Sequence, residues 1–177
     1  MESLEHIRDE CKDIYDLGQP GPGMKDFFLH NNYQTIDINE NGKPDIIGDV
    51  HHLPLPDNSA DAILASSLLE HCHSPHIVVE EMKRVLRPRG RIFITVPFIH
   101  PYHGGLNRGT YCPDYYRFTK DGVMYLFRDF EIEITSDGGF FTSMSYFLPK
   151  LKFLKNMEFL YSNGKSRHQY FVYGYKQ

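Results

Sequence analysis

The chain has 177 residues, a length that suits one domain, which on folding buries roughly 70% of the surface that its unfolded form exposes. Its formal net charge is −4, and lysine and arginine form no stripe of the kind with which proteins bind nucleic acid. No run of roughly 18 apolar residues occurs, so no membrane-spanning helix is expected. We therefore expect neither a nucleic-acid nor a membrane partner.

The three cysteines, Cys11, Cys72 and Cys112, are odd in number and form no C-x-x-C pair. This pattern fits a reducing compartment better than a disulfide framework. The first ten residues are charged and lack the apolar stretch of a secretory signal peptide. A cytoplasmic location is therefore expected.

After a short helix expected over residues 4–12, the stretch from Ile14 to Asp37 carries the main functional signal. A short apolar strand ends in Asp16, a glycine-rich turn follows, a helix begins near Met24, and a second strand ends in Asp37. Glycine permits positive φ and a close approach of the backbone to a ligand. An acid about 20 residues after the first glycine, at the carboxyl end of a parallel strand, can accept hydrogen bonds from ribose hydroxyls. The stretch predicts a nucleotide-type site.

The turn N-E-N-G-K-P leaves no room for a helix before a third strand, which ends at Asp49. The run D-A-I-L-A over residues 61–65 predicts a buried fourth strand. Ser74 and Pro75 suit an N-cap and a first helical position, and the residues R-P-R-G over 87–90 end that helix. The apolar run over 91–98 is typical of a central parallel strand.

Residues 100–113 are glycine-rich, aromatic and polar, and are too long for a plain connection, which predicts a lid or binding loop. Thr119 suits the N-cap of a further helix, and F-E-I-E-I-T alternates like a strand. Residues 143–161 are expected to be helical, and 167–176 to form a final, antiparallel strand.

This order of elements predicts an α/β fold: a Rossmann-like, doubly wound, mostly parallel sheet with helices on both faces and an antiparallel final strand. We expect a single domain over residues 1–177. Residues 14–98 form its cofactor-binding core, 99–119 a lid or substrate loop, and 120–177 the C-terminal helices and strands.

Several sequence motifs together resemble those of a class I S-adenosylmethionine-dependent methyltransferase, of the small-molecule, type 11-like kind. They lie in order over residues 14–98 and are D-L-G-Q-P-G-P-G, Y-Q-T-I-D-I, G-D-V-H-H-L-P-L-P-D, L-L-E-H, and the run from Glu80 to Pro97. The phrase P-D-Y-Y-R-F-T over 113–119 resembles members associated with surface-sugar and other small-metabolite pathways.

The resemblance implies S-adenosyl-L-methionine as cofactor and methyl transfer to a small polar acceptor, at oxygen. The three glycines of the turn would let the backbone approach the methionine portion. Asp16 would contact the amino group of the cofactor, Asp37 its ribose and Asp49 its adenine, and Ser66 would lie near the methyl group. The cofactor-binding residues implied are Asp16, Gly18, Gly21, Gly23, Asp37, Ile38, Asp49, Val50 and Ser66.

Candidate residues for the acceptor follow the fifth strand. His100 and His103 could take the proton of an acceptor hydroxyl, or could be polar lid residues. Tyr115, Tyr116 and Arg117 could hold the acceptor, Arg117 through a carboxylate or phosphate. Alternatively, the tyrosines pack the lid and Arg117 pairs with Asp114.

The ten histidines raise the question of a metal. His71, Cys72, His73 and His76, or His100 with His103, could supply ligands, but their spacing matches no standard zinc pattern, and no metal is expected.

The glycine turn departs from the family pattern, because its spacing is G-x-x-G-x-G and Pro20 and Pro22 remove N–H donors. About 13 residues precede the first strand, where relatives carry helices that close over the cofactor, so an open site or one completed by a partner subunit in a homodimer is expected.

Two alternative functions stay open: a catalytically decayed methyltransferase fold that serves as a binding or assembly module, and an NAD-dependent oxidoreductase.

Overall fold

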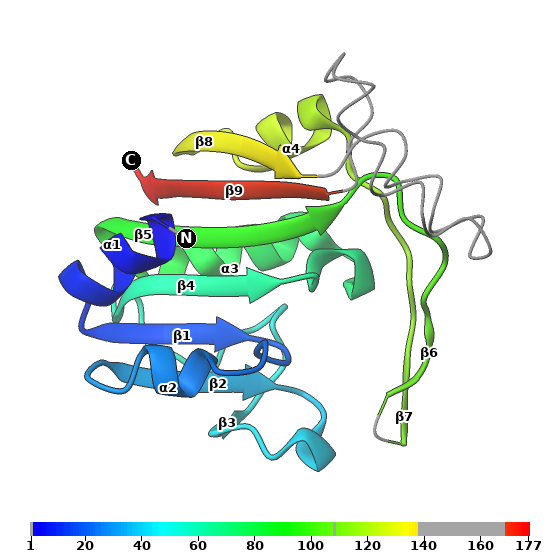
Figure 1. Ribbon diagram of the computed structural model, residues 1–177, viewed down its shortest axis with the longest axis horizontal. Coiled ribbons are helices and arrows are strands. Elements are labelled where there is room, and N and C mark those ends of the chain that lie inside the picture. Colours follow the sequence, from blue (N-terminus) through cyan, green and yellow to red (C-terminus); the bar gives the residue numbers. More distant parts are fainter. Residues whose placement is uncertain (1, 108, 138–168) are drawn as a thin grey trace.

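The computed structural model describes residues 2–107, 109–137 and 169–177 (Figure 1). Its centre is a seven-stranded sheet of order β3-β2-β1-β4-β5-β9-β8. The strands are β1 (Asp13–Leu17), β2 (Asn32–Asp37), β3 (Ile46–Ile47), β4 (Ala60–Ser66), β5 (Leu86–Pro97), β8 (Phe130–Asp137) and β9 (Gln169–Lys176). The first five are parallel, and β9 pairs antiparallel with both β5 and β8. The predicted sheet and its antiparallel final strand are confirmed.

Helices cover both faces of this sheet, as predicted. In Figure 1, α1 (Glu2–Glu10) and α2 (Met24–Phe27) lie in front of it, and α3 (Pro75–Val85) and α4 (Lys120–Leu126) lie behind. On the front face Ile7 and Phe28 are buried in one apolar cluster with strand residues. On the rear face Met82 and Val123 belong to the larger cluster. The core is therefore two apolar layers separated by the sheet. No helix in the described residues is long and apolar enough to cross a bilayer.

Several predicted boundaries hold, with local differences. Thr119 caps α4, because its hydroxyl accepts the N–H of Gly122 at 3.1 Å. Helix α3 begins after Ser74 as predicted, but the Ser74 side chain makes no capping hydrogen bond. The residues over 87–90 end α3 but lie inside β5, where Arg89 has a φ of 64° and the pairing with β4 shifts register. The helix predicted over 143–161 lies outside the described residues.

The predicted loop over 100–113 contains a hairpin that the sequence did not indicate. Its strands are β6 (Gly105–Asn107) and β7 (Thr110–Cys112), which pair antiparallel. Figure 1 shows the hairpin running past the carboxyl ends of the parallel strands. Two short 3-10 turns, η1 (Glu40–Gly42) and η2 (Leu69–His71), also lie at this end of the sheet.

Arg84, in the last turn of α3, binds the loop that connects β3 to β4. Its guanidinium donates to the carbonyl oxygens of Leu53 at 3.0 Å and Leu55 at 2.9 Å, and to Asp57 at 2.7 Å. It also donates to Glu81, whose carboxylate accepts the N–H of Leu53 at 2.8 Å. One side chain thus satisfies several polar groups of a loop that has no strand partner.

Replacing Arg84 should therefore cost stability. We expect Arg84→Gln to lower the free energy of unfolding by about 2 kcal/mol in urea denaturation, because the partly buried carbonyl groups of Leu53 and Leu55 and the carboxylate of Glu81 lose a charged donor. Arg8→Gln, at a site where the guanidinium contacts only the exposed Asp9 and the face of the Phe27 ring among the described residues, should change it by no more than about 1 kcal/mol. Equal effects of the two changes would contradict this account of the loop.

Candidate cofactor and acceptor site

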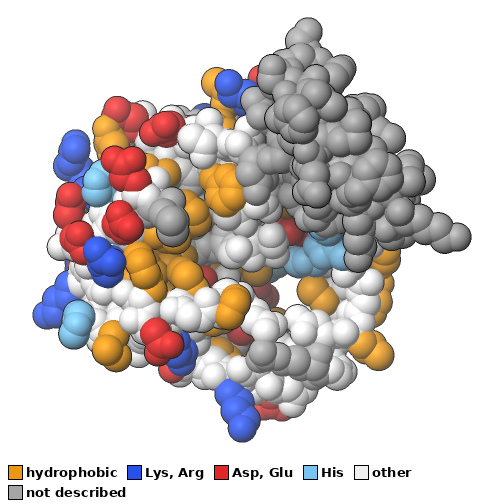
Figure 2. Space-filling view, in the orientation of Figure 1, with side chains coloured by type: hydrophobic (Ala, Val, Ile, Leu, Met, Phe, Trp, Pro, Cys, Tyr) orange, Lys and Arg blue, Asp and Glu red, His pale blue; other side chains and the backbone are white. Residues whose placement is uncertain are grey.

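A cavity of about 260 Å³ lies beyond the carboxyl ends of β1, β2 and β4. The predicted cofactor residues that line it are Gly18, Asp37, Ile38, Val50 and Ser66. The opposite wall comes from the hairpin, through Asn107, Thr110, Tyr111 and Cys112. Figure 2 shows a hollow between the hairpin and the body of the molecule, with histidine side chains on its rim. Residues far apart in the sequence thus surround one space.

The tip of the hairpin is attached to the loops that it faces. The carbonyl oxygen of Asn107 accepts from the Asn39 side chain at 3.1 Å, and the Asn107 side chain donates to Gln19 Oε1 at 3.5 Å. These bonds join the hairpin to the loop after β2 and to the glycine turn. The cavity is therefore covered by residues of the region predicted to be a lid.

In the glycine turn, the backbone has a positive φ that favours glycine at two of the three predicted positions. Gly18 has a φ of 82°, and a Cβ there would lie 3.1 Å from Leu68 Cδ1. Gly23, just before α2, has a φ of 80°. Gly21 has an ordinary φ, and a Cβ there would lie 3.8 Å from the Met24 side chain, an unstrained contact. The backbone comes close to a neighbour at Gly18, at the floor of the cavity.

The acid at the end of β2 faces the cavity beside apolar groups. Asp37 Oδ1 accepts the N–H of Asn39 at 2.9 Å, which fixes the carboxylate at the rim. Ile38 exposes 67% of its surface, and Val50 lies across the cavity with only 9% exposed. A carboxylate between two aliphatic walls suits a sugar joined to a flat base.

Asp49 is placed differently. Its carboxylate accepts the backbone N–H of His51 at 2.9 Å and lies 2.8 Å from His51 Nδ1. These contacts lower the pKa of Asp49 below its ordinary value, and the backbone hydrogen bond from His51 contributes most. The ring of His51 stacks on that of His73, with centroids 4.1 Å apart. Asp49 lines neither this cavity nor the next, so its contact with an adenine stays a prediction.

A second cavity, of about 510 Å³, lies on the other side of the glycine turn, next to α1. Asp16 and Gly21 line it, and Ser66 lines both cavities. Asp16 is 2% exposed and accepts a hydrogen bond from the Tyr33 hydroxyl at 2.5 Å, while its buried Oδ1 has no hydrogen-bond partner in the described part of the chain. Burial raises the pKa of Asp16 to about 6.

In the lid, Arg117 is engaged by protein groups. Its guanidinium donates to both oxygens of Asp114, at 2.5 and 2.7 Å, and to the carbonyl oxygens of His100 and Pro101. The hydrogen bonds from Arg117 hold the pKa of Asp114 well below its ordinary value. Asp114 also accepts the N–H of His103 at 2.9 Å. Of the two alternatives for Arg117, the structure has the pairing with Asp114.

The predicted acceptor residues lie beside, and not in, the two cavities. Tyr115 and Tyr116 are 53% and 40% exposed, and the Tyr116 hydroxyl donates to the carbonyl oxygen of His73 at 2.9 Å. The rings of His100 and His103 meet edge to face with centroids 4.7 Å apart. The four side chains lie in the same lid segment, without lining either cavity.

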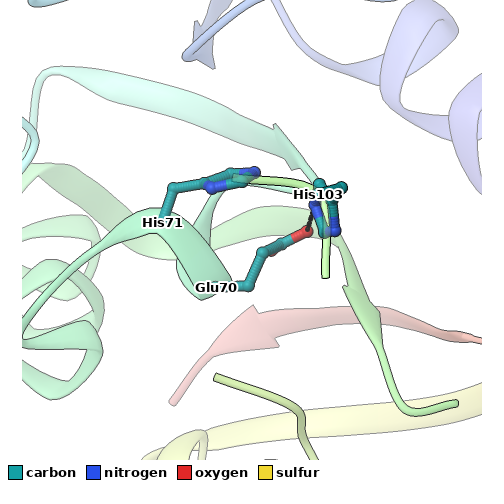
Figure 3. Close-up of side chains that lie close together, drawn as sticks. All are labelled: Glu70, His71 and His103. Carbon is teal, nitrogen blue, oxygen red and sulfur yellow. Dashed lines mark ion pairs between the residues drawn. The ribbon is translucent and has the colours of Figure 1, made fainter. Parts of the chain in front are cut away.

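Glu70 is the residue that sequence reasoning missed. It is fully buried in η2, burial raises its pKa to about 7, and its Oε1 lies 3.8 Å from His103 Nε2 (Figure 3). His71 is its neighbour, with Nδ1 2.5 Å from the carbonyl oxygen of Pro113. The motif L-L-E-H includes Glu70, but the contact between Glu70 and His103 depends on the tertiary structure and could not be read from the sequence.

Residues 29–94 match the family model of a methyltransferase domain. Together with the strand order and the cavity at the strand ends, this match, which covers well under half of the chain, supports a class I S-adenosylmethionine-dependent methyltransferase domain. The matched residues begin after the glycine turn, so the unusual spacing of that turn lies outside the match.

Relatives of the methyltransferase domain match over short segments. Demethylmenaquinone methyltransferase from Paenarthrobacter aurescens is 39% identical over 69 residues, 37% of this chain and 27% of its own length. An uncharacterized 37.1 kDa protein in transposon TN4556 of Streptomyces fradiae is 41% identical over 51 residues, 29% of this chain and 15% of its own length. The chain thus matches well under half the length of either relative.

The fold has similar solved structures over nearly its whole length. An S-adenosylmethionine-dependent methyltransferase from Mesorhizobium loti superposes with a TM-score of 0.60, covering 94% of this chain and 91% of the other, at 17% identity. At that identity the likeness establishes the fold of the methyltransferase domain.

The burial of Asp16 predicts that the stability of the protein depends on pH. The pKa of Asp16 is raised from 3.8 to about 6 on folding, so its stabilising contribution is complete below the unfolded value and is lost as the pH rises through the folded value. Relative to wild type, Asp16→Asn should gain on the order of 3 kcal/mol in free energy of unfolding between about pH 4 and 7. A constant difference between the two proteins across that range in chemical denaturation would contradict it.

The glycine turn offers a matched pair of substitutions. Gly18→Ala should lower the free energy of unfolding by about 1–2 kcal/mol, because a Cβ is strained at positive φ and crowds Leu68. Gly21→Ala should change it by about 0.5 kcal/mol or less, or stabilise slightly. Calorimetric unfolding of both variants tests this, and a larger loss for Gly21→Ala would mean that the turn is misplaced.

Proposed function

We propose that the domain transfers a methyl group from S-adenosyl-L-methionine to an oxygen of a small polar acceptor. The observation that supports this most directly is the cavity where the ends of β1, β2 and β4 and the loop after β3 bring Gly18, Asp37, Ser66 and Val50 together. The match to the methyltransferase family over residues 29–94 supports the same chemistry.

The residues around the two cavities fit the proposed cofactor. Asp37 would accept from the ribose hydroxyls, with Ile38 and Val50 on either side of the adenine. Among the described residues the buried Oδ1 of Asp16 has no hydrogen-bond partner, and an ammonium group in the second cavity would supply one, directly or through water. Asp49 would reach the adenine amino group after releasing His51. Gly21 and Gly23 would border the amino-acid portion.

When bound, this cofactor supplies a methyl group on a positively charged sulfur, and its transfer to oxygen forms a C–O bond as the C–S bond breaks and leaves its electron pair on sulfur. Ser66, which lines both cavities, would lie beneath the reacting atoms. The protein's main task is to align the acceptor, and positioning alone can supply roughly 7–11 kcal/mol of a barrier.

The acceptor would lie under the lid. His103, whose Nδ1 is 3.2 Å from Asp114, and His100 are the proposed acceptors of the hydroxyl proton. Tyr115 and Tyr116 would contact the acceptor, and Arg117 would act by holding Asp114. The cytoplasmic location and the small-molecule partner belong to this proposal, while a homodimer stays a prediction from the sequence.

Removing the ribose contact should weaken cofactor binding. Asp37→Ala should raise the dissociation constant for S-adenosylhomocysteine by roughly 10–100-fold, the loss expected for a hydrogen bond to a charged group. The measurement is calorimetric titration of the full chain, with Asp26→Ala, an exposed acid of α2, as the matched control. Unchanged affinity in Asp37→Ala would place the cofactor elsewhere.

The same preparation separates the alternatives. Transfer of a labelled methyl group to members of a panel of hydroxylated small molecules would support the enzyme. Affinity for S-adenosylhomocysteine without transfer to any acceptor would favour the binding module. Binding of NADH, followed by its fluorescence, with no affinity for S-adenosylhomocysteine would favour the oxidoreductase.

A further inference from the structure

We infer that Glu70, His71 and His103 form a site for a divalent transition-metal ion. Glu70 and His71 come from η2, and His103 comes from the loop after β5, so two segments meet at this point (Figure 3). One ligand atom from each residue lies within 4.8 Å of the other two. Two imidazoles and one carboxylate are a common ligand set for catalytic zinc and for non-haem iron.

The carboxylate of Glu70 needs a partner. The residue is fully buried, and neither Oε1 nor Oε2 has a hydrogen bond in the described part of the chain. Burial raises the pKa of Glu70, and its own backbone N–H and the Ser67 hydroxyl lie close enough to lower it, but neither makes a hydrogen bond of standard geometry to the carboxylate. A buried carboxylate without partners is costly, and a coordinated cation removes that cost.

Both histidines are oriented as metal ligands are. His71 Nδ1 lies 2.5 Å from the carbonyl oxygen of Pro113, and His103 Nδ1 lies 3.2 Å from Asp114 Oδ2. A carbonyl oxygen accepts from an N–H, so Nδ1 of His71 carries the proton and its Nε2 keeps the lone pair. Nδ1 of His103 lies 3.2 Å from the carbonyl oxygen of Pro101 and 3.4 Å from the Arg117 guanidinium, and the shorter contacts to oxygen favour the same tautomer. Histidine ligands usually have such a second partner, which fixes the ring and the tautomer. Arg117 in turn holds Asp114 in place.

Binding requires only a small contraction. Zinc–ligand bonds of 2.0–2.2 Å in a tetrahedron place the ligand atoms about 3.4 Å apart, so the three groups must move together by about 1.5 Å. The side chain of His103 is 31% exposed, and its ring already lies edge to face with that of His71 at 4.9 Å. Three protein ligands leave one position of the ion open.

That open position lies at the acceptor end of the site. His71 lines the same cavity as Ser66. The role of the ion, as distinct from its binding, rests on the proposed function. An acceptor hydroxyl bound to the ion would have a lower pKa and would be held toward the methyl group. His103 would then be a ligand, and His100 would remain as the proton acceptor.

The test is calorimetric titration of the EDTA-treated full chain with ZnCl₂ in the absence of cofactor. We expect one ion per chain. Glu70→Gln and His103→Asn should each weaken binding by at least about 10-fold, and Asp114→Asn by roughly 10-fold through loss of the second partner. His76→Asn, an exposed histidine on α3, is the matched control and should bind as wild type does. Co²⁺ in place of Zn²⁺ adds a visible absorption band that reports the ligand set.

No binding by wild type, or equal binding by wild type, Glu70→Gln and His103→Asn, would overturn the site. Binding that survives Glu70→Gln but is lost in Cys112→Ser would place the ion on the thiol and would also overturn it. Circular dichroism checks that each variant folds, and two independent ligand variants keep the test decisive. Asp37→Ala should still bind zinc, so failure of the cofactor site and failure of the metal site are separate results.

Discussion

The register of β1 with its two neighbours is the constraint on which the site depends. Leu17 pairs with Ile36 on one side and with Ala65 on the other. Gly18 and Ser66, and Asp37 on the adjacent strand, therefore emerge together at one edge of the sheet. A slip by one residue would turn a set of buried side chains to the opposite face, so the burial of Ile14, Leu17 and Ile36 specifies the position of the polar groups beyond them.

The lid is held at this edge by bonds of the polypeptide itself. The carbonyl oxygen of Glu70 accepts the N–H of Tyr115 at 2.7 Å, and that of Pro97 accepts the N–H of Phe118 at 2.9 Å. Together with the pair of Asp114 and Arg117, these bonds return the chain from the hairpin to the sheet. The buried acid of η2 and the histidine of the lid thus face each other because the backbone brings them together.

The central sheet and much of the cavity lining could be predicted from the sequence. Apolar runs and turn residues locate β1, β2, β4 and β5, and acids or glycines at the strand ends then follow from the geometry of parallel sheets. The hairpin escaped prediction because Leu106 and Tyr111 are exposed, so its strands lack an alternating apolar face. The meeting of Glu70 with His103 joins segments 33 positions apart through the fold, and no local pattern encodes it. The third strand was expected to end at Asp49, but β3 ends at Ile47, and the ring of His51 contacts the Asp49 carboxylate.

The charge of the cavity wall has a consequence for selectivity. None of the described residues that line the 260 Å³ cavity is lysine or arginine, and the guanidinium of Arg117 is already paired with Asp114. From these side chains an anionic compound such as a phosphate ester would gain no counter-charge for its lost hydration, so it would depend on the inferred divalent ion, whereas a neutral polyol would lose far less. If the proposed function holds, loading the site with a divalent ion would widen the range of acceptors from neutral compounds to anionic ones.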